Sequence, residues 1–159
     1  MVKSPMSAGR HRLSLSVTLT PTAIAAIKSR SGGERGRYGL HSDSAALCRM
    51  AERYDHLITQ ATPHVELAEW RLICDALNGT AMLDAWSPNY VTMEIADHCR
   101  LNGAGETWGV DGAALVARLN TMTMVERFAV VDVADRFWAA VARGEEPKLP
   151  GEDAPATAS

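Results

Sequence analysis

The sequence has few cysteines and none of the spacings that form a disulfide framework or a zinc site. Three cysteines, Cys48, Cys74 and Cys99, lie in three separate helical patterns and form no CxxC pair. An odd number of separated cysteines argues against a disulfide framework, so we expect reduced residues of the core. Cys99 follows Asp97 and His98, but consecutive helical residues point in different directions, so we expect no metal site there.

Long apolar runs and enzyme motifs are also lacking. The longest apolar stretches, such as 128–131 and 138–141, are far shorter than a bilayer span, and the N-terminus has no signal-peptide core. There is no glycine-rich phosphate loop after a strand, no HExxH and no nucleophile elbow. We interpret His64, Glu66 and the Asp97-His98 pair as polar surface residues. The prediction is a cytoplasmic protein that is not an enzyme and needs no cofactor or metal.

The most informative feature that is present is the strict alternation of polar and apolar residues over positions 12–20. The polar face carries Arg12, Ser14, Ser16 and Thr18, and the apolar face carries Leu13, Leu15, Val17 and Leu19. This pattern predicts a β-strand whose apolar face is buried and whose polar face is accessible to a ligand. A two-stranded ribbon with short hydroxyls and an arginine fits the DNA major groove. The alternative is an edge strand of an ordinary sheet that binds nothing.

The net charge of −3 conceals an asymmetry along the chain. Residues 1–60 hold nine of the 16 Lys and Arg and four of the 19 Asp and Glu, which gives +5 and leaves −8 for the rest. A basic first half and an acidic second half are typical of a phosphate-binding module joined to a separate helical partner.

The remaining pattern is helical. Thr20 with Pro21, Ser42 or Asp43, Asp111, and the Thr123–Glu126 capping box predict four helix starts. The expected helices cover about 21–31, 43–58, 63–77, 87–102, 111–119 and 124–141. The predicted fold is therefore mainly α with one N-terminal strand.

Residues 10–60 resemble the ribbon-helix-helix family, and the CopG group more closely than Arc. The resemblance rests on the alternating segment 15–20, on Gly39-Leu40-His41-Ser42-Asp43-Ser44, and on the helix that runs on to Tyr54. It implies an obligate dimer whose antiparallel strands form one ribbon and share a core between subunits. The loop between the two helices is longer than is usual in the family.

The resemblance also implies roles for individual residues. Arg12, Ser14, Ser16 and Thr18 would read bases. Independently of the resemblance, we expect Arg35 and Arg37 of the loop to bind the DNA backbone. Ser42, Asp43 and Ser44 would hold a phosphate at a helix N-terminus. The dimer core would consist of Leu13, Leu15, Val17, Leu19, Leu47, Met50 and Tyr54.

The second half resembles helical domains of uncharacterised proteins encoded on mobile elements. The segments EWRLICDALNG, WGVDG and ERFAVVDVADRFW carry this resemblance. It implies no activity, but an acidic helical bundle suits oligomerisation, control of operator spacing, or binding of another protein.

These observations predict four parts and one leading function. The parts are a flexible arm over 1–10, a ribbon-helix-helix domain over 11–60, a helical domain over 62–143 and a disordered tail over 144–159. The leading prediction is a sequence-specific homodimer that binds double-stranded DNA as a transcription regulator, an antitoxin or a nucleoprotein component of a mobile element. The alternatives are a protein-binding inhibitor of host defence that resembles an anti-CRISPR, and a purely structural dimerisation module.

Overall fold

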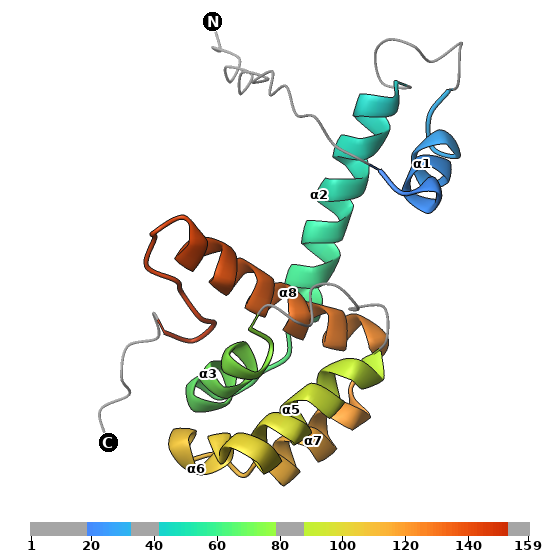
Figure 1. The fold of residues 1–159 in the computed structure, drawn as a ribbon. Helices are drawn as coiled ribbons and strands as arrows, with labels where there is room; N and C mark the ends of the chain where they lie inside the picture. The colour runs from blue at the N-terminus through green and yellow to red at the C-terminus, as the bar shows by residue number, and fades with distance from the viewer. Residues whose placement is uncertain (1–18, 33–41, 79–87, 153–159) are drawn as a thin grey trace, which may run out of the picture. The chain divides into compact units, whose positions relative to one another are not determined.

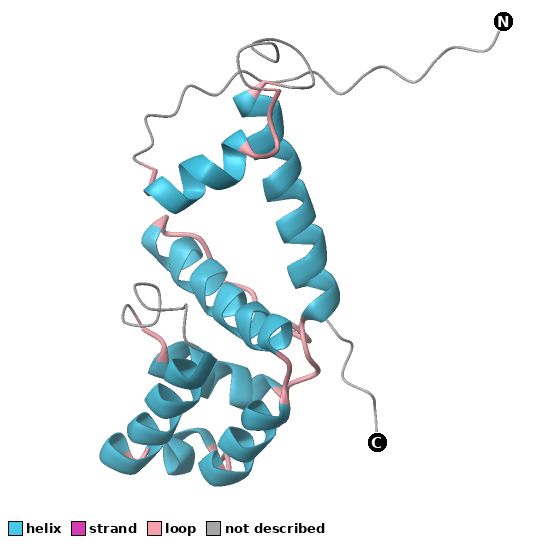
Figure 2. Ribbon diagram, turned by 90° about the vertical axis from the view of Figure 1, so that its right-hand side faces the viewer, coloured by secondary structure: helices cyan, strands magenta, loops and turns pink. Residues whose placement is uncertain are grey.

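The computed structural model describes residues 19–32, 42–78 and 88–152, and this part of the chain is helical without a strand (Figure 2). The mainly α fold is confirmed. All of the predicted strand except Leu19 and Thr20 lies outside the described residues, so the strand and the ribbon-helix-helix arrangement stay predictions. The chain divides into two compact units, Met1–Ala51 and Glu52–Ser159, and each is considered by itself.

The first unit contains α1, Pro21–Lys28, which begins as the sequence predicts (Figure 1). The Thr20 hydroxyl accepts a hydrogen bond from the Ala23 N–H at 3.2 Å, and Pro21 occupies the first turn. The helix ends three residues earlier than expected. The Arg30 N–H bonds to the Ile27 carbonyl, a tighter i to i−3 bond that closes the last turn.

Helix α2, Asp43–Ala61, contributes residues to both units. The Ser42 hydroxyl accepts a hydrogen bond from the Ala45 N–H at 3.1 Å, which confirms the predicted start. The helix ends before Thr62-Pro63, where the sequence predicts a break, because the residue before a proline is disfavoured in helical conformation.

Helix α3, Leu67–Ala76, starts four residues later than the sequence predicts. The reason is a capping box in which Glu66 is the N-cap: the Glu66 side chain accepts from the backbone of Glu69, and the Glu69 carboxylate accepts from the Glu66 N–H at 3.0 Å. The preceding residues 62–66 are not helical, although Val65 is buried.

In the described part of the second unit, three helices come between the end of α3 and the start of the last described helix. They are α5, Pro88–Asn102, the five-residue α6, Ala104–Trp108, and α7, Gly112–Thr121. The sequence predicts a simple turn where α6 lies. Gly103 and Gly109 flank α6 with φ of 63° and 66°, a left-handed conformation that glycine adopts without strain. Asp111 caps α7 through Ala114, as predicted.

Helix α8, Met124–Ala142, begins at the predicted capping box. The Glu126 N–H donates to the Thr123 hydroxyl at 3.3 Å, and the Thr123 N–H donates to the Glu126 carboxylate at 2.7 Å. Contacts join α5 to α7, and α3, α5 and α8 to one another, so the core of this unit lies among these helices (Figure 1).

The residues buried in the second unit are those that the apolar spacing of the sequence predicts in α3. In α8 the agreement is poorer. Trp70, Ile73, Cys74 and Leu77 of the α3 segment are buried as predicted, as are Val91 and Ile95 of α5. In α8 the buried side chains are mostly small, and Val141 is 41% exposed, although the pattern predicts it to be inside. The buried residues of α8 are Ala129, Val130, Val131 and Ala134.

The segment after α8 differs from the disordered tail that its composition suggests. Leu149 is 5% exposed and joins the core cluster of the second unit. Its N–H donates to the Glu152 carboxylate at 2.8 Å, and Arg71 pairs with Glu152 at 3.6 Å. One buried leucine and these polar contacts order residues up to Glu152.

Candidate functional site

Most of the predicted DNA-reading residues lie outside the described part of the chain. This applies to the predicted DNA-binding residues Arg12, Ser14, Ser16, Thr18, Arg35 and Arg37, and also to the predicted dimer-core residues Leu13, Leu15 and Val17. The described members are the DNA-binding group Ser42, Asp43 and Ser44 at the start of α2, and the dimer-core residues Leu19 before α1 and Leu47, Met50 and Tyr54 along α2. The candidate site is therefore built from α1 and α2.

The start of α2 is tied to α1 through an ion pair between Asp43 and Lys28. The Lys28 hydrogen bond is the main cause that lowers the pKa of Asp43, and the Ser31 hydroxyl adds to it. Because Lys28 offsets the Asp43 charge, the start of α2 does not repel an anion as strongly as Asp43 alone would. The exposed Ser44 leaves a second hydroxyl beside the Ser42 cap.

Two arginine side chains bind backbone carbonyls near the end of α1. The Arg30 guanidinium donates to the Ala26 carbonyl at 2.9 Å, and the Arg49 guanidinium donates to the Arg30 carbonyl at 3.2 Å. Positive side chains are favourable beside the last carbonyls of a helix. The arrangement places two guanidinium groups and the Lys28 ammonium in the described part of the first unit.

The described part of the first unit buries little apolar surface. Ile27 at 6% and Ala46 at 0% are its buried residues, whereas Leu19, Ile24 and Leu47 are 36%, 45% and 44% exposed. Leu19 and Leu47 belong to the predicted dimer core. They therefore have accessible surface with which a second chain could make contact.

Tyr54 is also in the predicted dimer core, and the structure gives its hydroxyl a partner on α8. The hydroxyl donates to Asp132 Oδ1 at 3.4 Å, while the residue as a whole remains 52% exposed. Burial of the hydroxyl is the main cause that raises the pKa of Tyr54, and the Asp132 charge adds to it. Arg136 pairs with Asp55 at 3.1 Å and with Asp132 at 2.7 Å, which fixes the second half of α2 on α8.

His98 lies in a polar cluster that the sequence analysis missed. His98 Nε2 lies 3.0 Å from Asp75 Oδ2, His98 Nδ1 lies 2.9 Å from the Asn102 amide, and the Trp108 indole donates to Asp75 at 3.3 Å. A carboxylate only accepts, so Nε2 donates and Nδ1 accepts. Neither ring nitrogen is left to exchange a proton with a substrate, so the cluster joins α3, α5 and α6. The i, i+4 spacing of His98 and Asn102 was the one available signal.

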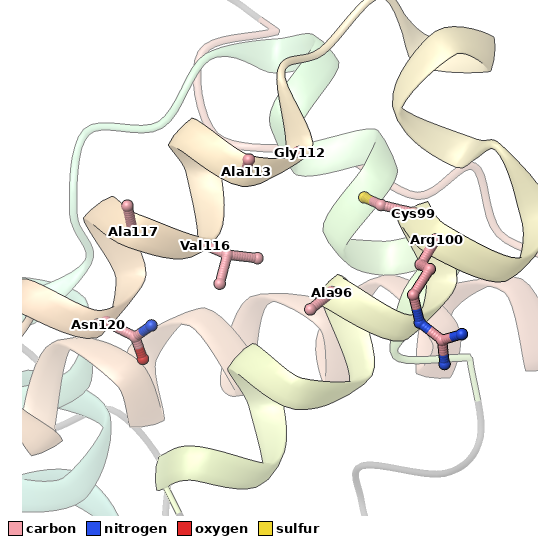
Figure 3. Close-up of a pocket in the computed structure, with 8 residues that line it drawn as sticks. All are labelled: Ala96, Cys99, Arg100, Gly112, Ala113, Val116, Ala117 and Asn120. Atoms are coloured by element: carbon pink, nitrogen blue, oxygen red, sulfur yellow. The ribbon is translucent and has the colours of Figure 1, made fainter.

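A groove of about 580 Å³ lies between α5 and α7 (Figure 3). Its walls are mostly small and apolar, as the lining shows: Ala96, Cys99, Arg100, Gly112, Ala113, Val116, Ala117 and Asn120. Burial raises the pKa of the Cys99 thiol, and Arg100 is paired with Asp97 at 2.9 Å. These groups supply no activated nucleophile and no general base.

No group of three His, Cys, Asp or Glu side chains in the described segments could hold a metal ion. His64 and Glu66 lie 3.6 Å apart with side chains 94% and 74% exposed, in agreement with their interpretation as surface residues. None of the described helices combines the length and the apolar character needed to cross a membrane.

Comparison with known proteins gives no relative. No family model, no curated protein and no solved structure matches this chain. The ribbon-helix-helix resemblance of residues 10–60 and the resemblance of the second half therefore stay predictions from the sequence.

Proposed function

We propose that this protein is a homodimer that binds a specific DNA sequence and acts by occupying an operator or by organising a nucleoprotein complex. The observation that carries the proposal is the small core of the first unit. The described residues of the first unit bury Ile27 and Ala46 and expose Leu19, Ile24 and Leu47, so they present apolar side chains that association can cover. A second copy would cover these side chains.

The start of α2 supports a phosphate contact. Ser42 and Ser44 offer hydroxyls there, and the remaining N–H groups of the first turn carry the positive end of the helix dipole. Lys28 offsets Asp43, and Arg30 and Arg49 add positive charge in the same unit. Contacts of this kind position a protein on DNA without reading its sequence.

The predicted two-stranded ribbon would then recognise the DNA sequence. In the predicted strand, Ser14, Ser16 and Thr18 share one face with Arg12. An antiparallel pair of such strands enters the major groove, where hydroxyl and guanidinium groups reach base edges.

The experiment is a titration of the full chain with a duplex from the region upstream of its own gene and with a scrambled duplex. We expect binding that prefers its own DNA and weakens as salt rises, because phosphate contacts release counterions. Substitution of Ser16→Glu together with Thr18→Glu should abolish this preference and leave the dimer intact, since two carboxylates on the outer face repel the DNA.

The matched control is Ala114→Glu with Ala117→Glu, which adds the same charge to exposed positions of α7. The control should bind DNA as the natural chain does. Equal binding by the Ser16/Thr18 variant and the control would contradict the reading role of the ribbon. It would favour the alternative in which the first half only dimerises and the acidic half binds a protein.

A further inference from the structure

The start of α2 contains an anion of its own, the Asp43 carboxylate. It pairs with the ammonium group of Lys28, the last residue of α1, and both residues belong to the first unit. The side chains of Lys28 and Asp43 are 58% and 47% exposed, so solvent and ligands reach both partners. An ion pair this accessible is weak, because water and salt screen it, and another anion can replace the carboxylate.

The surroundings of the Asp43 carboxylate favour a negative charge. Lys28 is the main cause that lowers the pKa of Asp43, and the Ser31 hydroxyl adds to this effect. Asp43 also lies in the first turn of α2, where the helix dipole favours an anion. The carboxylate therefore occupies the environment that the proposed function assigns to a DNA phosphate.

A carboxylate and a phosphate compete for the same ammonium group. Both present anionic oxygens that accept hydrogen bonds from a lysine. When a phosphate reaches the start of α2, Lys28 has to exchange part of its contact with Asp43 for the new contact, and the Asp43 charge repels the phosphate. The result is a lower affinity for every duplex, because the phosphates are the same in all sequences.

We propose that Asp43 is an internal competitor that limits how tightly Lys28 binds DNA phosphates. The inference rests on the DNA binding of the proposed function and adds a control of affinity at the start of α2. A phosphate contact carries no information on the base sequence, so Asp43 weakens binding to all duplexes by the same factor. The preference for one duplex over another does not depend on Asp43.

The test is Asp43→Asn in the full chain, titrated with the duplex from the region upstream of its own gene and with the scrambled duplex. Both dissociation constants should fall by about tenfold, since the proposed dimer carries two such sites. The logarithm of the binding constant should depend on the logarithm of the salt concentration with a slope steeper by about two, because each released Lys28 neutralises one more phosphate. The ratio of the two constants should not change.

Lys28→Gln separates competition from simple repulsion. If Asp43 holds Lys28, this change should weaken DNA binding by less than about threefold in the natural chain and by about tenfold in the Asp43→Asn chain. Equal losses in both chains would overturn the competition, since Asp43 would then act on the DNA through its charge alone.

Asp97→Asn is the matched control, because it removes the same charge from an ion pair of similar exposure. Asp97 pairs with Arg100 at 2.9 Å, and their side chains are 50% and 67% exposed. The control should leave both constants unchanged. Asp43→Ser, which places another residue favoured at helix starts, should reproduce the effect of Asp43→Asn, and circular dichroism should show the natural helix content in both.

The two proposals fail in different ways. If the natural chain binds its own duplex and the Asp43 variants bind no more tightly than Asp97→Asn, the competition is overturned and the proposed function stands. If none of these chains binds either duplex, both are overturned.

Discussion

Gly112 illustrates how one residue sets the distance between two helices. A Cβ at this position would lie 2.5 Å from Cys99 Sγ and 3.1 Å from Cys99 Cβ, so a larger residue fits only if the Cys99 side chain rotates away and its neighbourhood shifts slightly. The absence of a side chain lets these helices approach closely and forms one end of the groove between them.

Substitution of Gly112→Ala should therefore destabilise the protein by about 1 to 3 kcal/mol, the usual cost of overpacking a core contact. In an open helical position the same change is stabilising, because alanine has the higher helix propensity. Urea unfolding followed by circular dichroism measures the difference. The added change Cys99→Ala should recover part of the loss, since it removes the sulfur atom at the closest contact, and no recovery would contradict this origin of the strain.

Asp132 and Asp135 lie on a partly buried side of α8. Asp132 accepts from Tyr54 and pairs with Arg136, and Asp135 lies about one turn further along the helix. Burial is the main cause that raises the pKa of Asp135 above 3.8, and the Asp132 charge adds to it. The folded state therefore binds this proton more tightly than the unfolded chain does.

The raised pKa of Asp135 predicts how the free energy of unfolding depends on pH. The ionised Asp135 opposes folding, and this penalty grows as pH rises from the unfolded value of 3.8 through the raised folded pKa. Asp135→Asn should raise the free energy of unfolding at pH 7, and the gain should shrink toward zero below about pH 3.8, where the carboxyl is protonated in both states. Denaturant titrations at both pH values test this, and a gain independent of pH would contradict it.

At the scale of the whole molecule, the described parts of the two units differ in how many apolar side chains they bury. The second unit contains the extended cluster around Trp70, Leu72, Ile95 and Leu115, each fully buried. The described part of the first unit has Ile27 and Ala46. Its stability should therefore depend on the second copy that the proposed dimer supplies.

Hydrogen exchange at two protein concentrations tests this difference. On dilution below the dimer dissociation constant, amides of α1 and of the start of α2 should lose protection, because their partner chain dissociates. Amides of α3, α5 and α8 should exchange at the same rate at both concentrations. No loss in either unit would show that the first unit does not depend on association, and equal loss in both would show that the two units do not differ in this dependence.

Local signals in the sequence determined four of the helix starts, those of α1, α2, α7 and α8. Thr20 with Pro21, Ser42, Asp111 and the Thr123–Glu126 box act over three or four residues, so a pattern of side chains is sufficient to predict them. The inward face of α3 was also predictable, because Trp70, Ile73, Cys74 and Leu77 repeat at helical spacing and all are buried.

Only the tertiary structure decided which side chains from distant segments meet. His98 with Asp75, Tyr54 with Asp132 and Leu149 with the core of the second unit are separated along the chain, and no local pattern specifies such pairs. The packing in α8 likewise favours small residues such as Ala129 and Ala134, because closely packed neighbours limit the volume there. Leu19 and Leu47 of the predicted dimer core remain accessible in the single chain, and we propose that another copy covers them.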